Sequence, residues 1–301
     1  MELATGLNNL GLLSTNLGRS EQALAYHRQA LAMYEELYAA DKFPNGHPEI
    51  AKSLNNVGRA LSAIGQDAEA LDHLQRSLEM FRRLYPASKY PDGHPRLAAI
   101  YNNVGHQLSK MGQADSALAY VRQGNEQCLK LYSPSIYPLG HPELADSYHN
   151  LGSALVAAGR TDEAWQTLAK AMTMQTRLLK RESATASESV ALDLAARHRR
   201  STIHAFLSAS ESMPNTEAES YAAIFELKGT VQSILHRRHL AALIQSQHSI
   251  ETRRAFDRLA NVQREIGRLL GNAAQDLSAR DQRLAELNDD RDRLTRELSK
   301  T

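Results

Sequence analysis

The stretch GHPEIAKSLNNVG at residues 46–58 recurs as GHPRLAAIYNNVG at residues 93–105 and as GHPELADSYHNLG at residues 140–152. Each step is 47 residues, and the end of the motif also occurs as NNLG at residues 8–11, which gives four copies before Lys180. Fixed periods of roughly 20 to 50 residues are typical of stacked arrays, because one unit cannot bury its apolar face without its neighbours. We therefore expect an array whose function lies on a surface rather than in a catalytic pocket.

Each copy contains two stretches with helical periodicity. Pro48 suits a first helical turn, where its missing N–H would be unsatisfied anyway, and Gly65 suits the left-handed residue that ends a helix. The repeating unit is therefore predicted to be a helical hairpin in an all-α fold, with Gly58 and its equivalents where the two helices cross. In the second copy the apolar positions are Ile50, Leu54, Val57, Leu61 and Ile64, then Ala70, Leu71, Leu74, Leu78, Phe81 and Leu84.

The composition argues against several classes of protein. The chain holds 35 Lys and Arg against 34 Asp and Glu, without the basic excess of a nucleic-acid-binding domain. No apolar run approaches the ~20 residues that a membrane-spanning helix requires, and the N-terminus has no signal-peptide pattern. The single cysteine, Cys128, excludes an internal disulfide framework. We expect a cytoplasmic protein that binds neither nucleic acid nor membranes.

The order Asn-Leu-Gly, Gly, Glu-Ala or a similar pair, and Ala-Leu in each copy resembles the tetratricopeptide repeat, in the long variety found in kinesin light chains. The resemblance covers residues 2–180. It implies a superhelical solenoid with a concave groove that binds a peptide or a partner protein, and it implies no cofactor. The four repeats would span about residues 1–46, 47–93, 94–140 and 141–180.

The linker at residues 84–95, with its Tyr-Pro and Gly-His-Pro elements, resembles those of bacterial arrays that precede a caspase-like CHAT domain. The stretches YAAIFELKG at residues 221–229, HRRH at residues 236–239 and the closing residues 283–298 resemble the helical connector of the same proteins. The resemblance implies a sensing or regulatory part without its protease-like domain. Carried back one step from Pro48, the period places Met1 at a proline position, so we expect a fragment of a longer array.

Asparagines occupy equivalent positions in the predicted first helices, at Asn9, Asn56, Asn103 and Asn150. The resemblance implies that such an asparagine contacts the ligand backbone through its amide, which both donates and accepts. The alternative is that it bonds a neighbouring carbonyl and tightens the stacking of repeats. Residues that differ between copies would set specificity, and their mixed charge favours an extended ligand held by several weak contacts. The further candidates are Asn55, Asn102, Lys52, Arg59, His106, Lys110, Asp146 and His149.

Metal and catalytic chemistry have weaker support. The linker histidines each precede a proline at a helix start and occur once per repeat, so we expect them near helix N-caps beside a linker tyrosine rather than around a metal. Cys128 stands where other copies have Tyr34, Phe81 and Gln175, which indicates a packing role. We expect a non-enzymatic chain. The linker histidines are His47, His94 and His141.

After Lys180 the repeat markers stop. Residues 181–211 are expected to cap the apolar end of the array. Residues 212–301 are expected to form a helical connector that ends in an antiparallel, coiled-coil-like hairpin. Three functions stay open: the regulatory part of a protein with a CHAT domain, a cargo or assembly adaptor like a kinesin light chain, and a structural module that oligomerises through its last two helices.

Overall fold

The computed structural model describes residues 1–183, 202–211, 216, 218–226, 229, 250–271 and 277–298, and these residues form helices joined by turns, with no strand among them. They divide into two compact units. Unit 1 comprises residues 1–131 with residues 157–159, and unit 2 comprises residues 132–156 with the described residues from 160 onward. The prediction of an all-α fold is confirmed.

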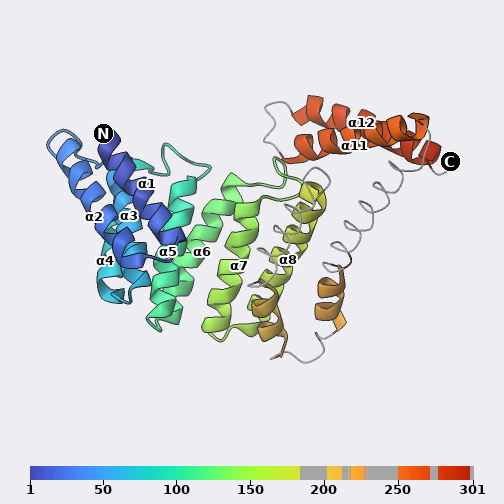
Figure 1. The fold of residues 1–301 in the computed structure, drawn as a ribbon. Helices are drawn as coiled ribbons and strands as arrows, with labels where there is room; N and C mark the ends of the chain where they lie inside the picture. The colour runs from blue at the N-terminus through green and yellow to red at the C-terminus, as the bar shows by residue number, and fades with distance from the viewer. Residues whose placement is uncertain are drawn as a thin grey trace. The chain divides into compact units, whose positions relative to one another are not determined.

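Unit 1 contains three helical hairpins in succession (Figure 1). Each consecutive pair of helices packs together, both within a hairpin and between one hairpin and the next. The predicted helical hairpin is therefore the repeating unit. The helices are α1 (Glu2–Asn16) and α2 (Ser20–Leu37), α3 (Pro48–Ala63) and α4 (Asp67–Leu84), and α5 (Pro95–Lys110) and α6 (Ala114–Leu131).

The turn inside each hairpin contains the predicted glycine. Gly65 has a φ of +81°, and the amides of Gly65 and Gln66 donate to the carbonyls of Ser62 at 3.1 Å and Leu61 at 3.0 Å. These two bonds form a Schellman motif, which satisfies carbonyl groups at the end of α3. Pro48 lies in the first turn of the same helix, as predicted.

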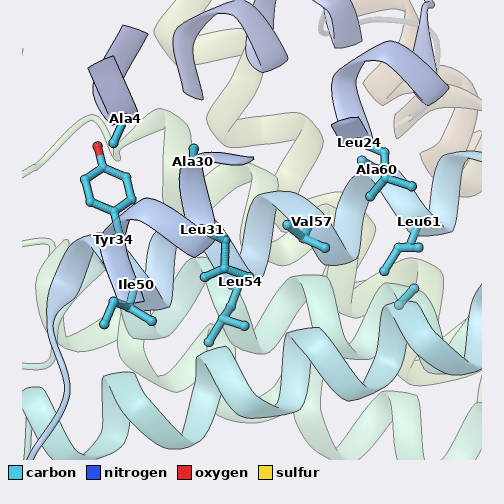
Figure 2. Close-up of a cluster of buried hydrophobic side chains, with 11 residues drawn as sticks. Ala4, Leu24, Ala30, Leu31, Tyr34, Ile50, Leu54, Val57, Ala60 and Leu61 are labelled. Atoms are coloured by element: carbon cyan, nitrogen blue, oxygen red, sulfur yellow. The ribbon is translucent and has the colours of Figure 1, made fainter. Parts of the chain in front are cut away.

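The apolar core of unit 1 lies between successive hairpins (Figure 2). Leu31 and Tyr34 of α2 are buried in one cluster with Leu54 and Val57 of α3. Burying a leucine or valine side chain contributes about 1.5–3 kcal/mol, so a large part of each hairpin's stability comes from its neighbour. A second cluster joins α3 and α4 to the third hairpin in the same way.

The two helices of each hairpin cross at a glycine. A Cβ atom at Gly105 would lie 2.4 Å from Cγ2 of Val121 and 3.1 Å from the carbonyl oxygen of Ala117. Such distances leave no room for a side chain, so the predicted requirement for a small residue at the crossing is confirmed. The equivalent glycines are Gly11, which faces His27, Gly58, which faces Leu74, and Gly152, which faces Leu168.

Unit 2 contains α7 (Pro142–Ala157) up to residue 156 and α8 (Thr161–Ser183). The helical residues 202–211 and 218–226 pack on α8. The rings of Trp165 and Phe206 stack with centroids 5.9 Å apart, and Nε1 of Trp165 donates to Oγ of Ser220 at 3.1 Å. A helix within residues 181–211 was predicted to cap the array, and Phe206 of that range covers part of α8. Residues 184–201 of that prediction lie outside the described residues.

The last two described helices, α11 (Ile250–Gly271) and α12 (Leu277–Leu298), form an antiparallel pair. Arg283 of α12 donates to Glu265 of α11 at 2.8 Å, while Val262 and Leu294 line one groove further along. Leu294 is buried, as is Leu287. The coiled-coil geometry and the proposed domain boundaries stay predictions, and the HRRH run at residues 236–239 lies outside the described residues.

Candidate functional site

Each linker between hairpins holds a histidine stacked on a tyrosine. In the second linker the ring centroids of Tyr85 and His94 are 3.5 Å apart, and Tyr90 meets the histidine ring edge-on at 5.3 Å. Nδ1 of His94 accepts a hydrogen bond from the amide of Arg96 at 3.2 Å, which makes this histidine the N-cap of α5. The predicted N-cap position beside a tyrosine is confirmed. The same arrangement recurs with Tyr38 and His47 and with Tyr132 and His141.

The chemistry of these linkers is structural. Burial lowers the pKa of His47, His94 and His141 below 6.5, so the rings favour the neutral form that can accept at Nδ1. Among the described residues, no three His, Cys, Asp or Glu side chains gather closely enough to hold a metal ion. The linker histidines therefore fix helix starts within each linker.

The repeated asparagines join successive first helices in unit 1. Nδ2 of Asn56 donates to Oδ1 of Asn8 at 2.9 Å, and Nδ2 of Asn103 donates to Oδ1 of Asn55 at 2.7 Å. In each bond, the donor belongs to one repeat and the acceptor to the repeat before it. Asn56 is buried and Asn103 is half-buried. This geometry favours the stacking alternative for these two residues, while a role in ligand binding stays a prediction.

Replacing both Asn56 and Asn103 by alanine is expected to lower the free energy of unfolding by about 2 kcal/mol, because each loses one hydrogen bond between repeats. Urea denaturation measures the change. The matched control is Asn9→Ala, at the equivalent exposed position of α1, where the side chain makes no hydrogen bond within the described chain. This control should change stability by less than about 0.5 kcal/mol. Equal stability of all three proteins would remove the support for stacking.

The other predicted binding residues differ in exposure. Arg59 of α3 and His106 of α5 are exposed at equivalent positions, and neither makes a hydrogen bond or ion pair within the described part of the chain. Lys52 is half-buried and its Nζ lies 3.5 Å from Glu49. The half-buried candidates are Asn55 and Asn102 in unit 1 and His149 and Asn150 in unit 2, where Asp146 is exposed.

Lys110 belongs to a polar cluster that the sequence patterns did not reveal. Its Nζ lies 2.7 Å from Oδ1 of Asp67 and 2.6 Å from the carbonyl oxygen of Ser62. Nε2 of Gln107 donates to the same Asp67 oxygen at 2.9 Å. The hydrogen bond from Lys110 and, to a smaller extent, that from Gln107 hold the pKa of Asp67 below its usual value. The available signal was Gln107 itself, at a position where the neighbouring repeat has Ala60.

His27 is a second polar group that the patterns left unnoticed. Its ring is buried against Gly11, and its Nδ1 donates to Oδ1 of Asn8 at 3.0 Å, because that amide oxygen can only accept. Burial lowers the pKa of His27 from 6.5 to about 4, and the positive charge of Arg59 acts in the same direction. The available signal was a histidine at a position where other repeats have Leu74, Val121 and Leu168.

Cys128 lies in α6 and is buried, in agreement with the predicted packing role. A buried thiol on a helix is poorly placed to attack a substrate. In the described helices, no segment combines the length and apolar character needed to cross a membrane.

Comparisons with known proteins identify the repeat. Family profiles for the tetratricopeptide repeat match residues 2–83 and residues 144–184. None of the curated proteins matches the sequence. Among solved structures, a protein of Podosopora anserina described as a kinesin light chain with nearly identical TPR-like repeats is 18% identical, with 81% of this chain and 97% of that chain covered and a TM-score of 0.53.

Two further structures show the same likeness. A form of the Podosopora anserina protein in which one glutamine is replaced by methionine is 19% identical over 77% of this chain and 96% of that chain, with a TM-score of 0.55. BtubC (BKLC) from P. vanneervenii is 16% identical over 81% of each chain, with a TM-score of 0.50. At these identities the likeness shows the fold alone.

Proposed function

This chain carries tetratricopeptide repeats, and we propose that it is a scaffold that binds an extended peptide or a partner protein on its first-helix face. The first-helix face is the side of α3 and α5 that carries Lys52, Arg59 and His106. The observation that carries the proposal is the pair of Arg59 and His106, exposed at equivalent positions and without hydrogen bonds or ion pairs in the described chain. Exposed polar groups that make no hydrogen bond or ion pair at equivalent positions are available to a ligand.

The side chains in this row suggest the chemistry of the ligand. Arg59 offers a planar fork of donors that fits a carboxylate or backbone carbonyl oxygens. Its equivalent in α1 is Leu12, which is exposed, and its equivalent in α5 is His106. Packed helix axes lie about 8–10 Å apart, which corresponds to about three residues of an extended chain. An extended segment with an apolar residue and, about three residues on, an acidic residue would match Leu12 and Arg59.

The proposal is tested with a peptide library displayed on phage and selected on the full chain. The selected peptides should be enriched in an apolar residue about three positions from an aspartate or glutamate. Replacing Arg59 and His106 together by alanine should weaken their binding at least tenfold, which corresponds to about 1.4 kcal/mol.

The matched control for this test is Arg76→Ala. Arg76 lies on α4, a second helix, and its guanidinium is about half exposed, 3.6 Å from Asp72. Its loss should leave the affinity unchanged. Equal loss of binding in the control and the double variant would contradict the assignment of the first-helix face, and so would unchanged binding in the double variant.

We further propose that the scaffold is cytoplasmic and that binding on the first-helix face regulates a caspase-like CHAT domain of the same protein. The support is the resemblance of the Gly-His-Pro linkers and of residues 221–229 to those of proteins that carry this domain. The codons that follow Thr301 in the gene test the idea. A domain with a histidine and cysteine dyad would support it, and a stop codon would favour a cargo or assembly adaptor like a kinesin light chain.

A further inference from the structure

A buried arginine of α12 contacts the third linker, which comprises residues 132–141. The guanidinium of Arg280 donates to the backbone carbonyl of Ile136 at 3.3 Å and to that of Ser135 at 3.5 Å, and the arginine side chain is only 8% exposed. Both sides of this contact belong to unit 2. A charged side chain is rarely buried without specific partners, so Arg280 marks a point at which α12 and the linker fit each other.

The backbone of the third linker is the same as that of the second linker. The amides of Lys89 and Ile136 donate to the carbonyls of Pro86 at 2.9 Å and Ser133 at 3.0 Å, which forms the same turn twice. In the second linker, Ser88 and Lys89 are exposed, and their carbonyl groups accept no hydrogen bond within the described chain. Backbone geometry therefore does not explain why the third linker receives an arginine.

The side chains of the third linker do explain it, because two positions that are polar in the other linkers are apolar here. Ile136 stands at a lysine position, and Leu139 stands at an asparagine or aspartate position. Both are half-buried, whereas the polar residues at the same positions are exposed. A lysine at position 136 would place a second positive charge near Arg280 and oppose its approach. The polar residues are Lys42, Lys89, Asn45 and Asp92.

We propose that the third linker is the docking site of α12, and that the bonds from Arg280 to Ser135 and Ile136 form a latch that opens while the chain stays folded. Asp281, the next residue of α12, accepts from Nε of Arg280 at 3.0 Å and is 65% exposed. This ion pair moves with α12, so release from the linker leaves the arginine with a partner. The bonds to the linker, at 3.3 and 3.5 Å, are long for N–H···O bonds and are the weaker part of the contact.

The docked linker leads directly into α7. Tyr137, which follows Ile136, meets the ring of His141 edge-on at 5.0 Å, and Nδ1 of His141 accepts from the amide of Glu143 in the first turn of α7 at 3.2 Å. The latch is therefore joined through adjoining contacts to the start of a first helix. An opened latch is expected to loosen the linker up to this helix start.

Hydrogen exchange of the full chain tests the docking. With Arg280→Gln, residues 133–140 should exchange about tenfold faster, because they lose bonds to a charged group. The equivalent residues 86–93 of the second linker are the internal reference and should not change. The matched control is Arg293→Gln, because Arg293 of the same helix is 66% exposed and pairs with Asp290. Unchanged exchange of residues 133–140 in Arg280→Gln, or equal acceleration in the control, would overturn the proposal.

Charge at position 136 tests whether the arginine holds the contact. Ile136→Lys introduces the lysine of the other linkers and should speed the exchange of residues 277–290 about tenfold, whereas Ile136→Glu should not speed it, because a carboxylate attracts Arg280. Lys89→Ile makes the reverse change in the second linker and should leave these residues unchanged. Circular dichroism checks that all variants fold. Equal release of α12 by lysine and glutamate would show that apolar packing holds the contact, which would contradict the latch.

Discussion

Replacing Gly105 by valine is expected to lower the free energy of unfolding by about 3 kcal/mol or more. The first new atom would lie 2.4 Å from Val121 Cγ2 and 3.1 Å from the backbone carbonyl oxygen of Ala117. The valine side chain could turn away, but the backbone of α6 could retreat only by opening the crossing of α5 and α6. Because both helices also contribute to the core shared with α3 and α4, this movement would disturb packing in two hairpins.

The matched control is Gly6→Val in α1, which places the same side chain in another first helix. An added Cβ at Gly6 meets no atom within 4 Å, and valine has a slightly better helix propensity than glycine. This variant should therefore change stability by less than about 0.5 kcal/mol in dilute solution. Thermal and urea unfolding measure both proteins. Equal melting temperatures for the two variants would show that the crossing can expand and that the glycine is not required there.

The repeated features of the fold were predictable because each has a local cause. Gly65 ends α3 through its left-handed backbone, Pro48 starts the same helix, and His94 caps α5. These roles depend on residues within a few positions in the chain. Because the same residues recur every 47 positions, the helix start or helix end deduced for one repeat also applies to the others.

The polar contacts between repeats were harder to predict because recurrence does not reveal a partner. Asn56 and Asn103 recur as a ligand-binding asparagine would, yet their amides donate to Asn8 and Asn55 of the preceding repeat. The sequence contains both members of each bond, but the choice between a neighbour and a ligand depends on the distance between helices. Departures from the repeat carry the signal that recurrence hides: His27 stands at a leucine position, and that difference alone marks it in the sequence.

Exposure is likewise set by position in the array. Leu3 and Ile50 are equivalent in the repeat and have almost the same chemistry, but one is 65% exposed and the other is 6% exposed. The period alone treats these two residues alike. The difference comes from α2, which packs on Ile50 and has no counterpart before α1 among residues 1–301.

Acidification is expected to weaken unit 1 through His27. The folded pKa of about 4 lies below the ordinary value of 6.5, so the folded state favours the neutral ring and the unfolded state binds the proton more readily. The stabilising contribution is therefore complete above pH 6.5 and is lost as the pH falls toward 4. With about 1.36 kcal/mol for each pH unit of difference, the loss is about 3 kcal/mol.

The test compares wild type with His27→Leu, which places in the first repeat the residue that Leu74 and Leu168 provide in two others. Urea denaturation from pH 7 to pH 4 should show a shallower fall in stability for the variant. Linker histidines and carboxylates titrate in both proteins, so the difference between the two curves isolates His27. Asn8 keeps its bond from Asn56 in the variant, because its Oδ1 accepts from both partners in the wild type. Parallel curves would mean that the ring takes up its proton without disturbing the fold, which its burial against Gly11 and the nearby charge of Arg59 argue against.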